Sequence, residues 1–377
     1  MLTGFFLAVA MACGCGGSNG SSGGNTTTAP ETKATAPTLT TSSAQGGAAI
    51  VTLASSTSGS TIYYTLDGSA PTNVSQQYQA PLLVSSKITI NAIAAAPGFL
   101  NSSVTTRSFA PSIASGTLVW SDEFANTGSS NALPDAKTWT YDKGFQCCGN
   151  NELEIYCAAG SAASPCDPNS PNAYIDTTGI LHIVGRNPSG TTYTSARLKT
   201  QGMFSFMYGR VEARMKLPES QGMWPAFWLL GNNISMISWP ACGELDVMEH
   251  IDGNNPPPNV GGTPMGYDWI AGSVHGGSSS AHLDGTEKYH ASGFSAADWH
   301  TYGMIWTKGQ VQFYVDDPAN VYATFTPANF GSPWPFDAGP QFIILNLAIG
   351  GDWPGNPDAT TVFPGDMQVD YVRLYTN

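Results

Sequence analysis

Charged side chains are scarce in this sequence. Only 11% of the 377 residues are Asp, Glu, Lys or Arg, against about 25% in a typical soluble protein. Basic residues are the scarcer kind: 14 Lys and Arg stand against 27 Asp and Glu, and the formal net charge is −13. Such a surface repels phosphate backbones and anionic lipids. Nucleic acid and membrane surfaces are therefore poor candidates for partners, and a neutral polymer is favoured.

The sequence also lacks a hydrophobic run long enough to span a bilayer as a helix. The apolar run at 2–12 is too short to span but suits the core of a signal peptide, which predicts secretion. The run ends at Cys13, in a context that resembles a lipoprotein cleavage site. We therefore expect a leader over 1–15 and a location outside the cell. Lipid anchoring through Cys13 to the outer cell surface and plain signal cleavage are both open.

No segment shows the spacing of apolar residues that is typical of a long amphipathic helix. Gly (42), Pro (26) and aromatic residues (11%) are plentiful. Residues 16–44 carry almost no large apolar side chain and are expected to form a flexible linker. A small β-sandwich is predicted over 45–110. Residues 117–377 alternate apolar and polar side chains in short segments, which predicts one two-sheet β-jelly roll. The fold class is therefore all-β.

The cysteines support an oxidising compartment. Cys147, Cys148, Cys157 and Cys166 crowd into one loop-rich stretch, and Cys242 stands alone. In a secreted protein such a cluster predicts one or two disulfides of undetermined connectivity. A zinc site is the alternative, but the stretch lacks two CxxC pairs and a histidine.

Three of the scarce acidic residues fall within six positions, at Glu244, Asp246 and Glu249. In a strand, Glu244 and Asp246 face the same side, whereas Glu249 has the wrong parity. A β-bulge at Val247–Met248 would insert one unpaired residue and bring all three acids onto one face. The repulsion among them would raise the pKa of one glutamic acid, which suits a general acid in glycoside hydrolysis. The alternatives without catalysis are a cation-binding site, or three acids exposed to solvent on an edge strand.

The small module resembles the β-sandwich at the end of chitobiase- and hexosaminidase-type enzymes, through "TIYYTLDGSAPT" and "APLLVSSKITINAIAAAPGF". Its role is open. A spacer that lifts the main domain off the cell is favoured, and sugar binding through Tyr63, Tyr64 or Tyr78 is the alternative.

The main domain resembles glycoside hydrolase family 16 in its laminarinase-like form. The resemblance covers essentially all of 117–377 through "LVWSDEF", "NNELEIY", "YGRVEARMKLP", "GMWPAFWLLG", "WPACGELDVMEHIDG", "NLAIGGDWPG" and "VDYVRLY". It implies a jelly roll with a long cleft and hydrolysis by double displacement. Glu244 is then the nucleophile, Glu249 the general acid/base, and Asp246 the residue that assists the nucleophile. No organic cofactor is implied.

The resemblance also implies residues that bind substrate. We expect Trp224, Trp228 and Trp239 to stack on sugar rings, although core packing is the alternative for Trp224 and Trp228. Further expected contacts are Asn151 and Arg197, at the glycone side, and His275, near the acid/base residue. The cysteine-rich insert borders the glycone side and would narrow or block the cleft there. A cleft closed at one end would count against strictly internal (endo) cleavage.

A structural calcium site is implied at Glu123, Asp370 and the carbonyl of Gly179. Capping carboxylates are the alternative for the two acids.

The expected substrate is β-1,3-glucan, cleaved internally, and a monomer is expected. Two alternatives stay open: the same mechanism on mixed-linkage glucan or a galactan, with transglycosylation as a variant, and a non-catalytic glucan-recognition protein. The presence of all three acids argues against the second.

Overall fold

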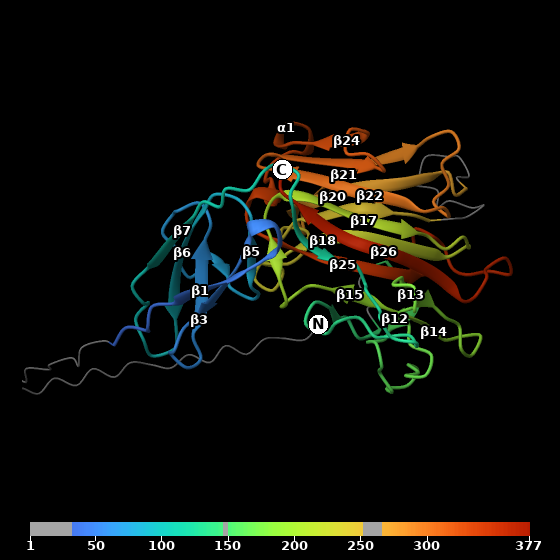
Figure 1. Ribbon diagram of the computed structural model, residues 1–377, viewed down its shortest axis with the longest axis horizontal. Helices are drawn as coiled ribbons and strands as arrows, with labels where there is room; N and C mark the ends of the chain where they lie inside the picture. The colour runs from blue at the N-terminus through green and yellow to red at the C-terminus, as the bar shows by residue number, and fades with distance from the viewer. Residues whose placement is uncertain (1–31, 146–149, 252–265) are drawn as a thin grey trace, which may run out of the picture. The chain divides into compact units, whose positions relative to one another are not determined.

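The computed structural model describes residues 32–145, 150–251 and 266–377 (Figure 1). The expected leader, most of the expected linker, and Cys147 and Cys148 lie outside the described residues. The described residues contain only β-strands, one four-residue α-helix and two short 3-10 helices. None of these helices is long and apolar enough to cross a membrane. The predicted all-β class is confirmed.

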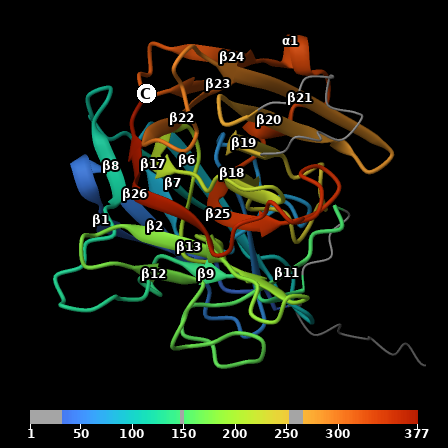
Figure 2. The same cartoon turned by 90° about the vertical axis from the view of Figure 1, so that its right-hand side faces the viewer.

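The main domain is built from two large sheets, which lie as separate layers in the turned view of Figure 2. In the first sheet, neighbouring strands are β16 (Ser205–Phe206), β25 (Gln341–Ile349), β18 (Met223–Gly231), β19 (Glu244–Glu249), β20 (Trp269–Ser278) and β21 (Ala281–His290), with β15 (Arg197–Lys199) also on β25 and β9 (Thr140–Tyr141) on β15. In the second sheet they are β12 (Ala173–Ile175), β13 (Leu181–Gly185), β26 (Gly365–Tyr375), β17 (Gly209–Lys216), β22 (His300–Thr307), β23 (Gln310–Val315) and β24 (Val321–Phe325), with β8 (Leu118–Asp122) also on β26.

Smaller elements complete the main domain. They are the strands β10 (Gly144–Phe145), β11 (Glu154–Tyr156) and β14 (Tyr193–Ser195), the helix α1 (Pro327–Phe330) and the 3-10 helix η2 (Pro335–Asp337).

The core of the main domain forms between the two sheets, as the alternating sequence predicts. In β17, Val211, Ala213 and Met215 are completely buried in the core, whereas Arg210, Arg214 and Lys216 on the other face are partly exposed and Glu212 on that face keeps 7% exposure. Side chains of a strand alternate between its faces, so every second residue enters the core. The predicted two-sheet jelly roll is confirmed.

The N-terminal module also has two sheets. One contains β4 (Gln76–Gln77), β3 (Thr61–Thr65), β6 (Ile88–Ala95) and β7 (Thr105–Phe109), and the other contains β1 (Thr38–Ser43), β2 (Ala49–Ala54) and β5 (Leu82–Val84), with the 3-10 helix η1 (Gln45–Gly47) between β1 and β2. Apolar side chains from β2, β3, β5 and β6 form one core. The module is therefore a small β-sandwich, as predicted.

The expected linker over 16–44 is wrong at its C-terminal end. Residues Thr38–Ser43 form β1, which pairs antiparallel with β2, and Leu39 packs against the module core. The segment looked too polar to fold alone, but threonine suits strands and the neighbouring strand satisfies its backbone.

The module joins the main domain through backbone pairing. Strand β5 lies parallel to β16, with Leu82 opposite Ser205 and Leu83 opposite Phe206, so the module's sheet continues into the first sheet. The Ser205 N–H donates to the Pro81 carbonyl at 3.0 Å. The two parts are thus hydrogen-bonded to each other as neighbouring strands are.

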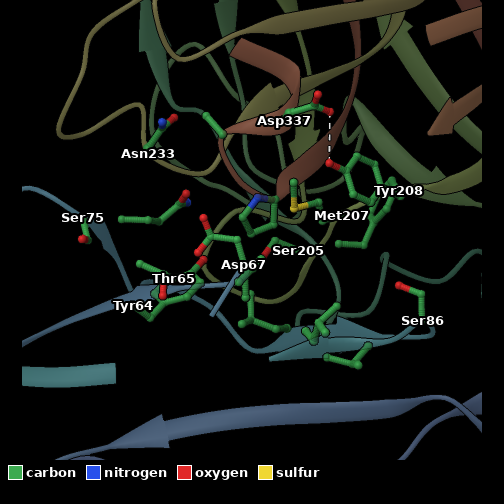
Figure 3. A pocket seen from close by; sticks show the side chains of 18 of the residues that line it. Tyr64, Thr65, Asp67, Ser75, Ser86, Ser205, Met207, Tyr208, Asn233 and Asp337 are labelled. Atoms are coloured by element: carbon green, nitrogen blue, oxygen red, sulfur yellow. Dashed lines mark hydrogen bonds between the residues drawn. The ribbon is translucent and has the colours of Figure 1, made fainter. Parts of the chain in front are cut away.

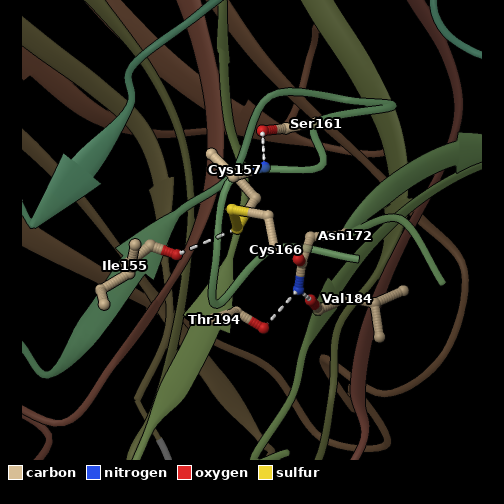
Figure 4. Close-up of a disulfide and its surroundings, with 8 residues drawn as sticks. Ile155, Cys157, Ser161, Cys166, Asn172, Val184 and Thr194 are labelled. Atoms are coloured by element: carbon tan, nitrogen blue, oxygen red, sulfur yellow. Dashed lines mark hydrogen bonds between the residues drawn. A yellow bond between two sulfur atoms is a disulfide. The ribbon is translucent and has the colours of Figure 1, made fainter. Parts of the chain in front are cut away.

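One disulfide lies in the cysteine-rich insert, between Cys157 and Cys166 (Figure 4). Beside it, the buried Asn172 amide donates to the Val184 carbonyl at 2.7 Å and to the Thr194 hydroxyl at 3.1 Å. The bridge confirms the prediction of at least one disulfide.

Gly46 provides a test of the junction. A Cβ at Gly46 would lie 2.3 Å from the Leu118 carbonyl oxygen in β8, whereas a Cβ at Gly59 would meet nothing within 4 Å. Both glycines have φ near +65° (+63° and +69°), so alanine costs about 1 kcal/mol at either position. Only Gly46→Ala must also push the module away from β8, at a further cost of about 1–3 kcal/mol.

We therefore expect Gly46→Ala to melt several degrees below Gly59→Ala in differential scanning calorimetry. Equal melting temperatures would contradict a close junction at this point.

Candidate active site

Strand β19 carries the predicted bulge. On the neighbouring strand β18, Trp228 pairs with Asp246 and Phe227 pairs with Met248, which leaves Val247 as the extra residue. The pairing with β20 shifts over the same stretch. The bulge that the parity of the acids required is therefore present, at the predicted position.

Three apolar side chains of β19 point into the core. Leu245, Val247 and Met248 are at most 1% exposed and belong to the core between the sheets. Because both bulge residues face the core, the alternation resumes one position later. Glu244, Asp246 and Glu249, which we call the three carboxyls, lie on the opposite face of β19.

The environment of the three carboxyls disfavours charge. Burial, followed by the repulsion of Asp246, raises the pKa of Glu244 well above its usual range, and His275 and Arg197 oppose the rise. Burial also raises the pKa of Asp246. Neighbouring carboxyls in a low-dielectric site cannot all ionise together, so the cluster holds protons near neutral pH.

Glu249 is suited to hold one of these protons. Burial, and next the charge of Asp246, raises the pKa of Glu249 to about 8. The indole N–H of Trp224 donates to Glu249 Oε1 at 3.0 Å and opposes part of the rise. Arg197 also acts on Glu244 and favours its ionised form, but the pKa of Glu244 is still raised well above its usual range. Burial therefore pushes both glutamic acids toward the protonated form, and the division into acid and nucleophile stays a prediction.

A histidine pair extends the site along β20 and β21. His275 Nε2 lies 3.2 Å from Asp246 Oδ2, and His275 Nδ1 lies 3.2 Å from His282 Nε2. The ring of Trp239 lies 4.9 Å from that of His282, and the Trp239 side chain is 45% exposed. Trp239 is thus partly exposed at this end of the site, and its stacking on a sugar ring stays a prediction.

The other end of the site is lined from β15, β18 and β25. The Arg197 guanidinium lies 4.5 Å above the Tyr156 ring and 5.6 Å from the Trp228 ring. The Trp228 N–H donates to Asn346 Oδ1 at 2.6 Å. In the register of the sheet, Arg197 of β15 lies opposite Asn346 of β25. Asn346 lies opposite Ala226 of β18, and Ala226 lies opposite Glu249 of β19. Arg197 and Glu249 therefore lie in one row across the sheet.

Trp224 and Asn151 lie close to this row but make fixed contacts of their own. The Trp224 ring meets Trp353 edge to face at 5.3 Å, besides its bond to Glu249. The Asn151 amide donates to both carboxylate oxygens of Asp352, at 2.9 and 3.0 Å. Stacking on substrate by Trp224 and hydrogen bonding by Asn151 stay predictions.

Sequence reasoning missed His282, Trp353 and Asp352. The second histidine could have been found from the β20–β21 hairpin, because a short turn at 278–281 returns 282 beside the strand of 275. No local pattern links Trp353 to Trp224, which is 129 positions away.

The residues expected to hold calcium lie elsewhere, at the second sheet. Glu123 accepts two hydrogen bonds from Arg373, at 2.9 and 2.8 Å, and Asp370 accepts one from Arg214 at 2.7 Å. Both carboxylates thus pair with arginines. The calcium site stays a prediction, and no step of the chemistry depends on it. In the described residues, the one group of at least three acidic, His or Cys side chains within metal-binding reach is Glu244, Asp246 and His275.

Comparison with known proteins agrees with this geometry. The sequence profile described as glycosyl hydrolases family 16 matches residues 159–373, which include all three carboxyls. This chain belongs to glycosyl hydrolases family 16. A second profile, described as Fn3 associated, matches residues 51–109 of the module.

Relatives and solved structures are similar to about two thirds of the chain. A beta-glucanase from Rhodothermus marinus is 38% identical over 274 residues, which is 68% of this chain and 84% of the relative. The laminarinase catalytic domain from Thermotoga maritima MSB8 superposes with a TM-score of 0.55 at 33% identity, covering 70% of this chain and 99% of that one. An endo-β-1,3-glucanase from Pyrococcus furiosus gives a TM-score of 0.54 at 38% identity, covering 69% and 94%. The chain is thus a glycoside hydrolase.

The bond between Trp224 and Glu249 yields a pH prediction. The N–H donor stabilises the carboxylate form of Glu249, so its removal raises the pKa of the acid. We expect Trp224→Phe to move the alkaline limb of kcat/KM from near the wild-type pKa of about 8 to higher pH. The acid must be protonated to act, so activity then persists at higher pH. The limb is measured on a soluble glucan between pH 5 and 10.

Trp353→Phe is the matched control, because Trp353 touches the Trp224 ring but makes no bond to Glu249 in the described structure. A limb that stays in place in Trp224→Phe, or moves down, would contradict Glu249 as the proton donor.

Proposed function

We propose that the chain hydrolyses internal β-1,3-glucosidic bonds of laminarin-type glucans, with retention of configuration. The observation that carries the proposal is the bulge at Val247, which puts two glutamic acids and an aspartic acid on the face of β19 that points away from the core. The names of the family 16 relatives, a beta-glucanase and β-1,3-glucanases among them, support the polymer.

The first step forms a covalent intermediate. The Glu244 carboxylate attacks the anomeric carbon, and the bond from that carbon to the leaving oxygen breaks. Glu249 donates its proton to the leaving oxygen, so the shortened chain departs as an alcohol. Asp246, between the two glutamic acids, keeps one proton in the cluster through its charge and faces His275.

The second step releases the sugar. Glu249, now ionised, takes a proton from a water molecule whose oxygen attacks the anomeric carbon. The ester bond to Glu244 breaks and the Glu244 carboxylate is restored. Two inversions give net retention, and the cycle needs only the two glutamic acids and water.

Other polymers and other outcomes fit the same site. Mixed-linkage glucan and galactans differ from β-1,3-glucan in how the chain curves through the cleft, and a sugar in place of water in the second step would give transglycosylation. A non-catalytic recognition protein fits less well. Burying three carboxyls lowers the stability of the fold, and a protein that only binds glucan would have no need of them. We also propose, from the leader, that the protein acts outside the cell or on its surface.

Product analysis tests the reaction, the polymer and the nucleophile together. Laminarin, barley glucan and agarose are digested in parallel. We expect laminari-oligosaccharides of several lengths, formed first as the β-anomer by NMR. Glu244→Gln should lower the rate by a factor of at least about 10³, because it removes the nucleophile.

Products from another polymer alone would keep the mechanism and overturn the substrate. Tight laminarin binding with no products from any polymer would favour a recognition protein.

Glu249→Gln separates the acid from the nucleophile. We expect a loss on the order of 10²–10⁴ in kcat on laminarin, because the leaving oxygen is no longer protonated. On 4-nitrophenyl β-laminaribioside, whose leaving group needs no proton, the first step should survive and azide should restore turnover as the glycosyl azide. Glu244→Gln should be inactive on both substrates. Equal losses for Glu249→Gln on both substrates, without azide rescue, would contradict its assignment.

A further inference from the structure

Two places outside the three carboxyls gather polar side chains, and they differ in what those side chains can reach. The first is a cavity of about 540 Å³ where the module meets the main domain, lined by Asp67, Tyr208 and Asp337 among others (Figure 3). The Tyr208 hydroxyl donates to Asp337 at 3.0 Å. Lining atoms that lack a hydrogen-bond partner, such as the Ser205 hydroxyl, are buried and out of reach of a molecule in the cavity. The second place is the histidine pair of β20 and β21, which reaches the three carboxyls directly.

His282 is the outer member of this pair. It is exposed, and in the register of the β20–β21 hairpin it lies opposite Gly277, which has no side chain. Its ring reaches His275, two residues along β20: the ring centroids are 5.2 Å apart, and Nε2 of His282 lies 3.2 Å from Nδ1 of His275. A hydrogen bond at this place holds one proton, so only one of the two nitrogens donates.

The buried end of this chain of contacts fixes its direction. The second nitrogen of His275, Nε2, lies 3.2 Å from Asp246 Oδ2, an atom that is buried and lacks a hydrogen bond. An ionised carboxylate can only accept, so a neutral His275 must carry its proton on Nε2 to serve Asp246. Its Nδ1 is then bare and needs a donor from the other side.

The groups around His275 leave His282 as that donor. In the register of the sheet, Glu244 of β19 lies opposite His275 on one side, and Asp284 of β21 lies opposite it on the other. Both are acids, and their ionised forms cannot donate. We infer that His282 is a positioning residue, whose Nε2–H donates to Nδ1 of His275 and so keeps the proton of His275 on Nε2, facing Asp246.

The position of this proton acts on the reaction through Asp246. The charge of Asp246 raises the pKa of both Glu244 and Glu249. An N–H on the facing nitrogen stabilises that charge, whereas a bare nitrogen repels it. Without His282, the proton of His275 is free to move to Nδ1, and Asp246 then loses its donor. The effect on turnover rests on the proposed function, but the position of the proton does not.

The tautomer of His275 can be measured directly, by long-range ¹H–¹⁵N NMR of the full chain with ¹⁵N-labelled histidine near pH 7. His275→Gln assigns the signals. We expect the wild-type proton on Nε2 alone, and a mixture of both tautomers in His282→Phe, which lacks the N–H but keeps a ring against Trp239. A wild-type proton on Nδ1, alone or together with one on Nε2, overturns the inference. So does an unchanged tautomer in His282→Phe.

Turnover of laminarin separates this role from simple packing against Trp239. We expect kcat to fall about tenfold in His282→Phe with KM nearly unchanged, because a hydrogen bond that serves a charged group is lost. His282→Gln, whose amide N–H can take the place of Nε2–H, should restore most of the rate. If the ring only supports Trp239, the two variants should show the reverse order, which overturns the inference. His290→Phe is the control, because His290 is on the same strand but faces Asp268.

The two measurements fail separately. A wild-type protein that cleaves no laminarin would overturn the proposed substrate, and the NMR signals would still decide where the proton of His275 lies.

Discussion

One unpaired residue, Val247, is the feature on which the active site depends. Without it, the regular alternation of β19 would turn Glu249 into the core, where the apolar packing has no partner for a carboxyl. With it, Val247 and Met248 both fill the core and the glutamic acid returns to the open face. The same residue thus serves packing on one side of the sheet and chemistry on the other. The bulge lies in the strand between β18 and β20, where neighbours on both sides hold it in place.

Burying three carboxyls opposes folding, and the surrounding groups offset this cost in different ways. Glu249 accepts a hydrogen bond from Trp224, Asp246 lies beside His275, and the charge of Arg197 favours the ionised form of Glu244. The rest of the cost is avoided because the cluster keeps protons, so that fewer of its carboxyls are charged. A site that must hold a proton at neutral pH is therefore also the arrangement that costs least to bury. Stability and the acid role of Glu249 have a common physical cause.

Features that depend on local periodicity could be predicted from the sequence. The alternating segments predicted the two sheets, and the parity of three acids placed the bulge at Val247–Met248, where the structure has it. Features that depend on pairing between distant segments could not. The parallel contact of β5 with β16 joins residues about 120 positions apart, and β1 looked like linker because its threonines find a partner only in β2. Likewise, nothing local showed that Arg373 and Arg214 take the carboxylates expected to bind calcium.

The continuity of the module's sheet with the first sheet has a consequence for the evolution and engineering of the protein. Where a module is strung on a flexible linker, it can be deleted or exchanged freely. Here, cutting before the main domain would strip β16 of its neighbour and leave unpaired N–H and C=O groups at the sheet edge. Exposed edges of this kind recruit strands from other molecules. A trimmed enzyme would thus gain a tendency to aggregate, and a replacement module would need a strand of its own to cover that edge.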